Sequence, residues 1–129
     1  DDRHAAHQFD VKPGELARLT RATGEAMRRF AGGTLLLWYP IKDLRPVAAF
    51  KRDLAALGLP KMLAVELFLQ TPDDAERLNG TGLIVVNPPF TLAGNLELVM
   101  PFLANVLKRG TGASWRVEII AKQEQGGAV

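Results

Sequence analysis

The sequence predicts an α/β domain of three layers, in which helices cover a mostly parallel β-sheet. Segments with apolar residues three and four positions apart alternate along the chain with short, unbroken apolar runs. The first pattern is typical of helices with one buried face, and the second is typical of strands covered on both faces, as in a parallel sheet. The chain has 129 residues, of which 47% are hydrophobic and 23% are charged, so it can form a packed core, and a disordered or collagen-like chain is excluded.

Along the chain, the first helix is expected from Pro13, which suits a first helical turn, to the glycine pair at residues 32–33. Phe30 is the last residue of the apolar stripe of this helix and is expected to be buried. The first strand is expected at residues 34–39, a continuous apolar run that follows the glycine pair. The second helix is expected at residues 46–57, where the apolar residues share one face and the charged residues the other.

The second strand is expected at residues 62–69, and the third at residues 83–86, a short β-branched run with a glycine before it. A third helix is expected at residues 94–108, with a kink or restart at Pro101, because proline cannot donate a hydrogen bond to the preceding turn. The last strand is expected at residues 115–121. This order of helices and strands supports the three-layer α/β prediction.

Residues 1–129 are expected to form a single domain with tails at residues 1–8 and 122–129. Sixteen lysines and arginines oppose 14 aspartates and glutamates, and the resulting net charge of +2 permits contact with a phosphate backbone without predicting it. The absence of cysteine excludes disulfides and thiolate catalysis, and His4 and His7 alone cannot complete a metal site. No apolar run reaches the roughly 18 residues that cross a bilayer, so a cytoplasmic protein without membrane contact is expected.

The strongest candidate site is Asn87-Pro88-Pro89-Phe90, which directly follows the predicted strand at residues 83–86. In open α/β sheets, ligands bind at the carboxyl ends of strands. The asparagine amide offers one acceptor and two donors, and the phenylalanine offers a stacking face, a combination that suits an adenine base. An acidic or amide residue before Pro-Pro-aromatic is also the catalytic signature of amino-group methyltransferases. The alternative interpretation is a rigid strand exit, with an asparagine cap and a core phenylalanine.

Other features are less specific. Trp38 and Tyr39 stand at the end of the first predicted strand; Trp38 is expected in the core, whereas Tyr39 either caps the core or lines a substrate pocket. Glu66 interrupts an apolar strand, so it is expected to pair with a neighbouring lysine or arginine or to point into a pocket. The Gly-Thr-Gly sequences at residues 80–82 and 110–112 are interpreted as turns or loops and not as a dinucleotide fingerprint.

Three segments resemble a known family. Residues 33–42, GTLLLWYPIK, are similar to the "GTYALWYPIK" stretch of a bacterial 23S ribosomal RNA adenine-N6 methyltransferase family, large-subunit methyltransferase J. Residues 79–90 resemble its "LNGSGLVVINPPW" stretch, and residues 100–103 resemble the "LPWL" that follows. The similarity runs from about Phe9 to Ile120. An older label connects this family with the catabolism of external DNA.

The resemblance implies the carboxyl-terminal half of a Rossmann-like class I methyltransferase fold. It also implies a parent enzyme that transfers a methyl group from S-adenosylmethionine to N6 of an adenine in 23S rRNA. In the family, a catalytic Asp-Pro-Pro-aromatic motif precedes the helix that here begins at Pro13. Phe9 stands at the aromatic position, but residues 6–8 are Ala-His-Gln, so no catalytic residue is assigned. The family's cofactor-binding half has no counterpart, and this chain alone is expected to be inactive and not to bind S-adenosylmethionine.

Two alternatives remain open at this point. The chain could be a non-catalytic nucleic-acid-binding module linked to the use of external DNA, as the older family label suggests. The turn at residues 87–90 could also be purely architectural, with no contact to a substrate.

Overall fold

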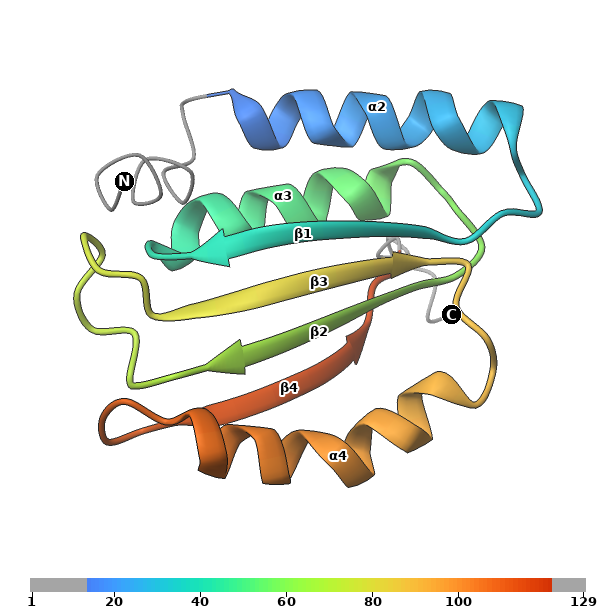
Figure 1. Ribbon diagram of the computed structural model, residues 1–129. Coiled ribbons are helices and arrows are strands. Elements are labelled where there is room, and N and C mark those ends of the chain that lie inside the picture. Colours follow the sequence, from blue (N-terminus) through green and yellow to red (C-terminus); the bar gives the residue numbers. More distant parts are fainter. Residues whose placement is uncertain (1–13, 122–129) are drawn as a thin grey trace, which may run out of the picture.

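The computed structural model describes residues 14–121, so the predicted tails and the expected helix start at Pro13 lie outside the described residues. Helices and strands follow one another as predicted, and the boundaries that can be compared agree within three residues. In chain order they are α2 (Glu15–Arg29), β1 (Leu35–Ile41), α3 (Leu44–Ala56), β2 (Met62–Phe68), β3 (Gly80–Val86), α4 (Leu92–Leu107) and β4 (Ser114–Ile119) (Figure 1).

Capping residues determine where α3 begins and ends. The Asp43 carboxylate accepts a hydrogen bond of 3.0 Å from the backbone N–H of Arg45, so the helix starts directly after β1. Pro46 falls within the first turn, where its missing N–H has no helical partner to lose. Gly58 follows the helix with a positive φ of 71°, a conformation that glycine adopts without strain.

The four strands among the described residues form one sheet in the order β1-β3-β2-β4. Every neighbouring pair is antiparallel, and β3 lies between β1 and β2 although it follows both in the chain (Figure 1). The prediction of a mostly parallel, three-layer, Rossmann-like sheet is therefore wrong. β2 is buried along almost its whole length, as its apolar run predicted, but burial does not determine the direction of the strand beside it.

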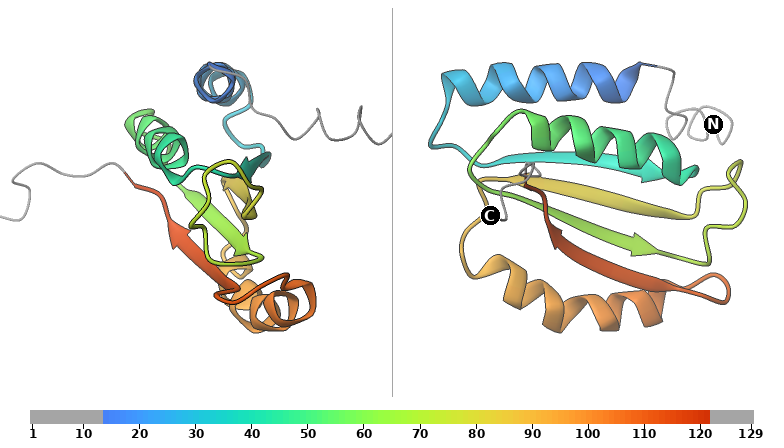
Figure 2. Two further views of the ribbon diagram at one scale, coloured as in Figure 1. Left: turned by 90° about the vertical axis from the view of Figure 1, so that its left-hand side faces the viewer. Right: turned by 180° about the vertical axis from the view of Figure 1, so that it is seen from behind.

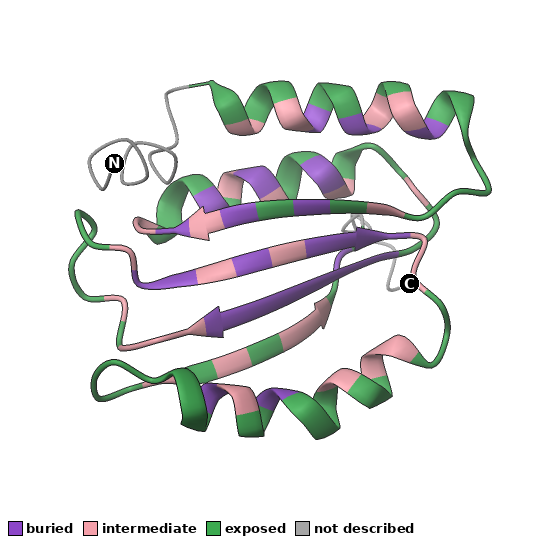
Figure 3. Cartoon of the chain, in the orientation of Figure 1, coloured by how far each residue is buried: buried purple, intermediate pink, exposed green. Residues whose placement is uncertain are grey.

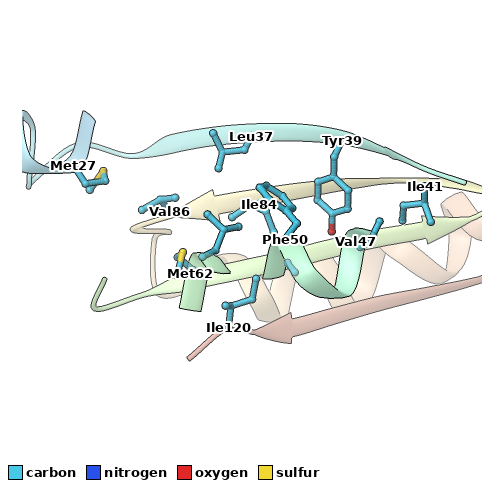
Figure 4. Packing of buried hydrophobic residues seen from close by; sticks show 12 residues of the cluster. Met27, Leu37, Tyr39, Ile41, Val47, Phe50, Met62, Ile84, Val86 and Ile120 are labelled. Atoms are coloured by element: carbon cyan, nitrogen blue, oxygen red, sulfur yellow. The ribbon is translucent and has the colours of Figure 1, made fainter. Parts of the chain in front are cut away.

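One face of the sheet is covered by α3, against which α2 packs (Figure 2). Residues of β1, β2 and β3, together with residues of α3 and α2, form a continuous apolar core on this side (Figure 4). Its buried members are Met27, Leu37, Tyr39, Ile41, Val47, Phe50, Leu54, Met62, Ala64, Ile84, Val86 and Ile120.

The other face is only partly covered. α4 packs against β4 and β2 there, and its Met100 and Ala104 are buried against a second apolar cluster. β1 receives no such cover, so Leu36 and Trp38 are exposed while the alternate residues of the strand are buried (Figure 3). Trp38 is 49% exposed, and the prediction that it belongs to the core is wrong. Both sides of β1 are apolar, but a helix covers only one of them.

Two further predictions are corrected by the structure. Residues 80–82, interpreted as a turn, are the beginning of β3, because each of the three pairs with β1 and with β2. α4 includes Pro101 and continues as one helix to Leu107, so the helix does not restart at the proline, and the alternative of a kink there stays a prediction.

Candidate functional site

One register position of the sheet brings together residues from all four strands. Tyr39 on β1 pairs with Gly82 on β3, and Gly82 pairs in turn with Glu66 on β2, which pairs with Arg116 on β4. A side chain at position 82 would collide with the ring of Tyr39. Because glycine leaves this space open, the ring extends from β1 across β3 toward β2 (Figure 4).

The hydroxyl group of Tyr39 and the ammonium group of Lys51 share one carboxylate oxygen. Tyr39 Oη donates a hydrogen bond of 2.7 Å to Glu66 Oε2, and Lys51 Nζ lies 2.9 Å from the same atom. Lys51 Nζ also lies 2.7 Å from Glu118 Oε1. Burial, and then the hydrogen bond to Glu66, raise the pKa of Tyr39 above its usual range, so its hydroxyl keeps the proton that it donates. The prediction that Glu66 pairs with a basic residue is confirmed.

A surface pocket of about 500 Å³ lies beside this network, between α3 and β4. Lys51, Glu66, Arg116 and Glu118 are among its lining residues. Lys51 is the one cation that contacts both carboxylates among the described residues, so its charge balances that of one of them. Arg116 is exposed and makes no ion pair within residues 14–121, so it is the group of this pocket that is most available to a ligand.

The predicted site at residues 87–90 forms a braced turn at the end of β3. Asn87 has a positive φ of 59°, a conformation that asparagine tolerates better than most residues. Its amide nitrogen donates to the carbonyl oxygens of Gly32 and Gly33 at 3.3 and 3.2 Å, and its own carbonyl accepts a 2.9 Å hydrogen bond from the hydroxyl of Thr34. Its backbone N–H donates to the carbonyl of Lys61 at 2.9 Å. Asn87 therefore joins the end of β3 to the loops that precede β1 and β2.

This end of the sheet presents two aromatic rings to solvent. Phe90 is 90% exposed, and Phe30, at the end of α2, is 69% exposed. Phe30 belongs to the same end because its carbonyl accepts a 2.9 Å hydrogen bond from Gly33, whose own carbonyl holds Asn87. The expectation that Phe30 is buried is wrong, since the chain leaves α2 at this residue. The alternative expectation of a core phenylalanine at position 90 is also wrong.

The structure therefore separates the predicted site residues. Asn87, Pro88, Pro89 and Phe90 lie together in the braced turn, with Pro88 half-buried and Pro89 exposed. Tyr39 lies four residue pairs further along β1, buried beneath α3, with its hydroxyl on Glu66.

The described residues do not fit a binding site for S-adenosylmethionine. Such a nucleotide-containing cofactor is typically held where a strand leads through a glycine-rich turn into a helix. Within residues 14–121, β1 and β3 lead into helices through Lys42-Asp43 and through the Asn-Pro-Pro-Phe turn, neither of which contains glycine. In the same part of the chain, no group of three or more His, Cys, Asp or Glu side chains could hold a metal ion. None of the described helices is both long and apolar enough to span a membrane.

Sequence reasoning missed three contributors to these two regions. Lys51 lies on a helix face that looked solvated, and its role depends on the packing of α3 over β2. Arg116 becomes a neighbour of Glu66 only through strand register. Phe30 follows the helical apolar spacing, and nothing in that spacing shows that α2 ends just before it.

The comparisons with known proteins agree with the resemblance seen in the sequence. A family model described as "Ribosomal RNA large subunit methyltransferase D, RlmJ" matches residues 9–121. A ribosomal RNA large subunit methyltransferase J from Haemophilus influenzae is 34% identical over 106 residues, which are 81% of this chain and 37% of that protein. The protein of the same name from Escherichia coli is 35% identical over 97 residues, covering 72% of this chain and 35% of that protein.

A solved structure agrees as well. A crystal structure of a Legionella pneumophila protein superposes with a TM-score of 0.73 at 27% identity, and the match covers 83% of this chain and 39% of that one. The chain thus spans little more than a third of the length of the curated relatives that it matches. On the family match and these identities, the chain belongs to the RlmJ family of ribosomal RNA large subunit methyltransferases.

Proposed function

We propose that this chain is the substrate-contacting part of an enzyme that methylates N6 of an adenine in 23S rRNA with S-adenosylmethionine as the methyl donor. Family membership supports the methyltransferase and its ribosomal RNA substrate, since both relatives are named for them. The cofactor would be bound by a part of the enzyme other than residues 14–121, because these residues contain no strand, glycine-rich turn and helix in succession.

The observation that carries this proposal is the exposure of the Phe90 ring to solvent at the end of the sheet. An apolar ring that is 90% exposed gains nothing for folding, whereas a flat nucleobase can stack on it. The hydrogen bonds of Asn87 hold the turn in place, so little freedom is lost when a base binds. The same end carries the exposed Phe30 and, at the last turn of α2, Arg29, which supplies positive charge for a phosphate group, whereas Arg28 is paired with Glu25 at 3.0 Å.

The role of this aromatic end can be measured by RNA binding. In a Phe90→Ala variant, the dissociation constant for a fluorescent single-stranded oligoadenylate should rise about tenfold, the loss expected when one base loses its stacking partner. Fluorescence anisotropy measures the change. Leu98→Ala is the matched control, because Leu98 is a similarly exposed apolar residue of α4 and should have little effect. Equal effects of both variants, or none for Phe90→Ala, would remove the turn from the substrate contact.

The cofactor part of the proposal has its own test. Isothermal titration of the 129-residue chain with S-adenosylmethionine should give no saturable heat. Saturable binding at micromolar concentrations would contradict the assignment of the cofactor site to another part of the enzyme.

A further inference from the structure

The loop between α4 and β4 forms a pocket that the proposed function leaves unused. This pocket has a volume of about 830 Å³ and is lined by the last turns of α4, by residues 108–113 and by Trp115. Two of the lining residues, Lys108 and Arg109, are basic, and none is acidic. The pocket lies at the opposite end of the sheet from Asn87, since β4 begins beside the end of β2 and the start of β3 (Figure 1).

The loop is held in one conformation by the segment that follows β2. The backbone N–H groups of Arg109 and Gly110 both donate to the carbonyl of Leu69, at 2.8 and 3.3 Å. Thr71 donates twice to the carbonyl of Thr111, from its backbone at 2.9 Å and from its hydroxyl at 3.1 Å. The backbone that carries Lys108 and Arg109 is therefore held in place before any ligand binds, and a ligand would not have to order the loop.

Close contact with Thr71 explains the glycine at position 112. Its φ is +81°, and an added Cβ atom would collide with the Thr71 hydroxyl. The Gly-Thr-Gly sequence thus serves to bring the loop against the β2–β3 segment, and it leaves the wall of the pocket free of large side chains between Arg109 and Trp115.

The positive charge of the pocket is not neutralised by the protein. Lys108 and Arg109 are exposed, and within residues 14–121 neither side chain makes an ion pair or a hydrogen bond. The carboxyl end of α4 contributes roughly half a negative charge, which is less than the charge of either residue. Trp115 lines the same pocket and is partly exposed, so its ring can be reached from solvent.

We propose that this pocket binds one nucleotide of a single-stranded segment of RNA, with its phosphate on Lys108 and Arg109 and its base against the indole of Trp115. Two adjacent cations beside an accessible aromatic ring form the combination that binds single-stranded nucleic acid without reading its sequence. The choice of RNA rests on the proposed function. The two contacts lie at opposite ends of seven-residue strands, about 20 Å apart, so the pocket would hold a part of the substrate outside the reacting adenine.

The test uses the fluorescence of Trp115. Trp38→Phe leaves Trp115 as the one tryptophan of the chain, and short oligoadenylate RNA should quench its emission saturably. In that background, changing Lys108 and Arg109 to alanine should weaken binding at least tenfold at low salt. It should also lower the slope of log Kd against log salt by about 0.7, the value for one phosphate contact on a single strand.

Arg18→Ala with Arg21→Ala on α2 is the matched control, since it removes the same charge from another surface. Equal loss in this control would show a non-specific charge effect and overturn the proposal, as would the absence of quenching. Quenching by free AMP at the same concentration as by the oligomer would also overturn it, because the ligand would then be a free nucleotide.

The two RNA proposals fail in different ways. Phe90→Ala should leave the quenching of Trp115 at saturation unchanged. If quenching is absent while Phe90→Ala still weakens binding, only the pocket is refuted. If quenching persists and Phe90→Ala has no effect, the pocket stands and the aromatic end of the sheet is not the substrate contact.

Discussion

The two faces of the sheet differ in how completely they are covered. Beneath α3 and α2, apolar residues of β1, β2 and β3 are buried, and the one carboxylate among them is paired with Lys51 and Tyr39. On the other face, α4 covers β2 and β4 and leaves the β1 side open. α4 itself exposes Leu98 and Phe102 and contains a single charged residue, Glu97. We conclude that the first face holds the larger apolar core, whereas the β1 side of the second face, the outer surface of α4 and the ends of the sheet are available for contacts.

The largest expected effect tests this difference with two phenylalanines. Phe50 is 2% exposed and makes an edge contact with Tyr39, with ring centroids 5.5 Å apart, whereas Phe102 is 66% exposed. Phe50→Ala should lower the free energy of unfolding by about 3–5 kcal/mol, and Phe102→Ala by less than about 0.5 kcal/mol. Urea denaturation measures both. Similar losses would mean that the α4 face is buried in solution, and the comparison of the two faces would fail.

Breaking the ion pair between Lys51 and Glu66 should have a smaller effect on the free energy of unfolding. Lys51→Met leaves the buried Glu66 without its cation and should lower the free energy of unfolding by about 3 kcal/mol, at the lower end for a buried pair because Lys51 is partly exposed. In a Glu66→Gln background the same substitution should have a much smaller effect, since no buried charge is left unpaired. A double-mutant cycle measured by urea denaturation gives the coupling. If the effects of Lys51→Met and Glu66→Gln on the free energy of unfolding were strictly additive, the two side chains would not interact, and the buried ion pair would be contradicted.

The smallest effect is a pH dependence confined to the covered face. Because the pKa of Tyr39 is raised in the folded chain, the unfolded chain loses this proton first as the pH increases. The contribution of Tyr39 to the free energy of unfolding is fully present below the ordinary pKa of tyrosine, about 10. Above that pH it falls by up to about 1.4 kcal/mol per pH unit. Tyr39→Phe, which replaces the one tyrosine of the chain, should lack this component in denaturation curves above pH 10. If the unaltered chain and Tyr39→Phe showed identical pH profiles, the Tyr39 hydroxyl would have to be exposed to water, which would contradict its burial.

The positions of helices and strands could be predicted from the sequence, but the arrangement of the strands could not. The apolar runs of β1 and β2 look alike, yet β2 is covered on both sides and β1 on one. A continuous apolar run predicts burial, and parallel direction was inferred from burial alone. The direction depends instead on the insertion of β3 between them, a long-range pairing that no local pattern specifies.

The candidate sites show the same limit. The turn at residues 87–90 was predicted as a unit because its residues are adjacent in the chain, whereas its partners at residues 32–34 were not predicted. Glu66 could be expected to have a basic partner, but the identity of Lys51 required the packing of α3. Residues 110–112 were interpreted as a turn or loop, but the contacts of this loop with Leu69 and Thr71, which lie about 40 residues earlier in the chain, were not predicted.

The glycine beneath Tyr39 has a consequence for how the strands align. To keep apolar residues in the core, β3 can slip only by two residues at a time. A slip in one direction would put Ile84 beneath the tyrosine ring, in space that the ring needs to reach Glu66. A slip in the other direction would put Gly82 where Ile84 now fills the centre of the core. One missing side chain therefore selects a single alignment of three strands from those that the apolar pattern alone allows.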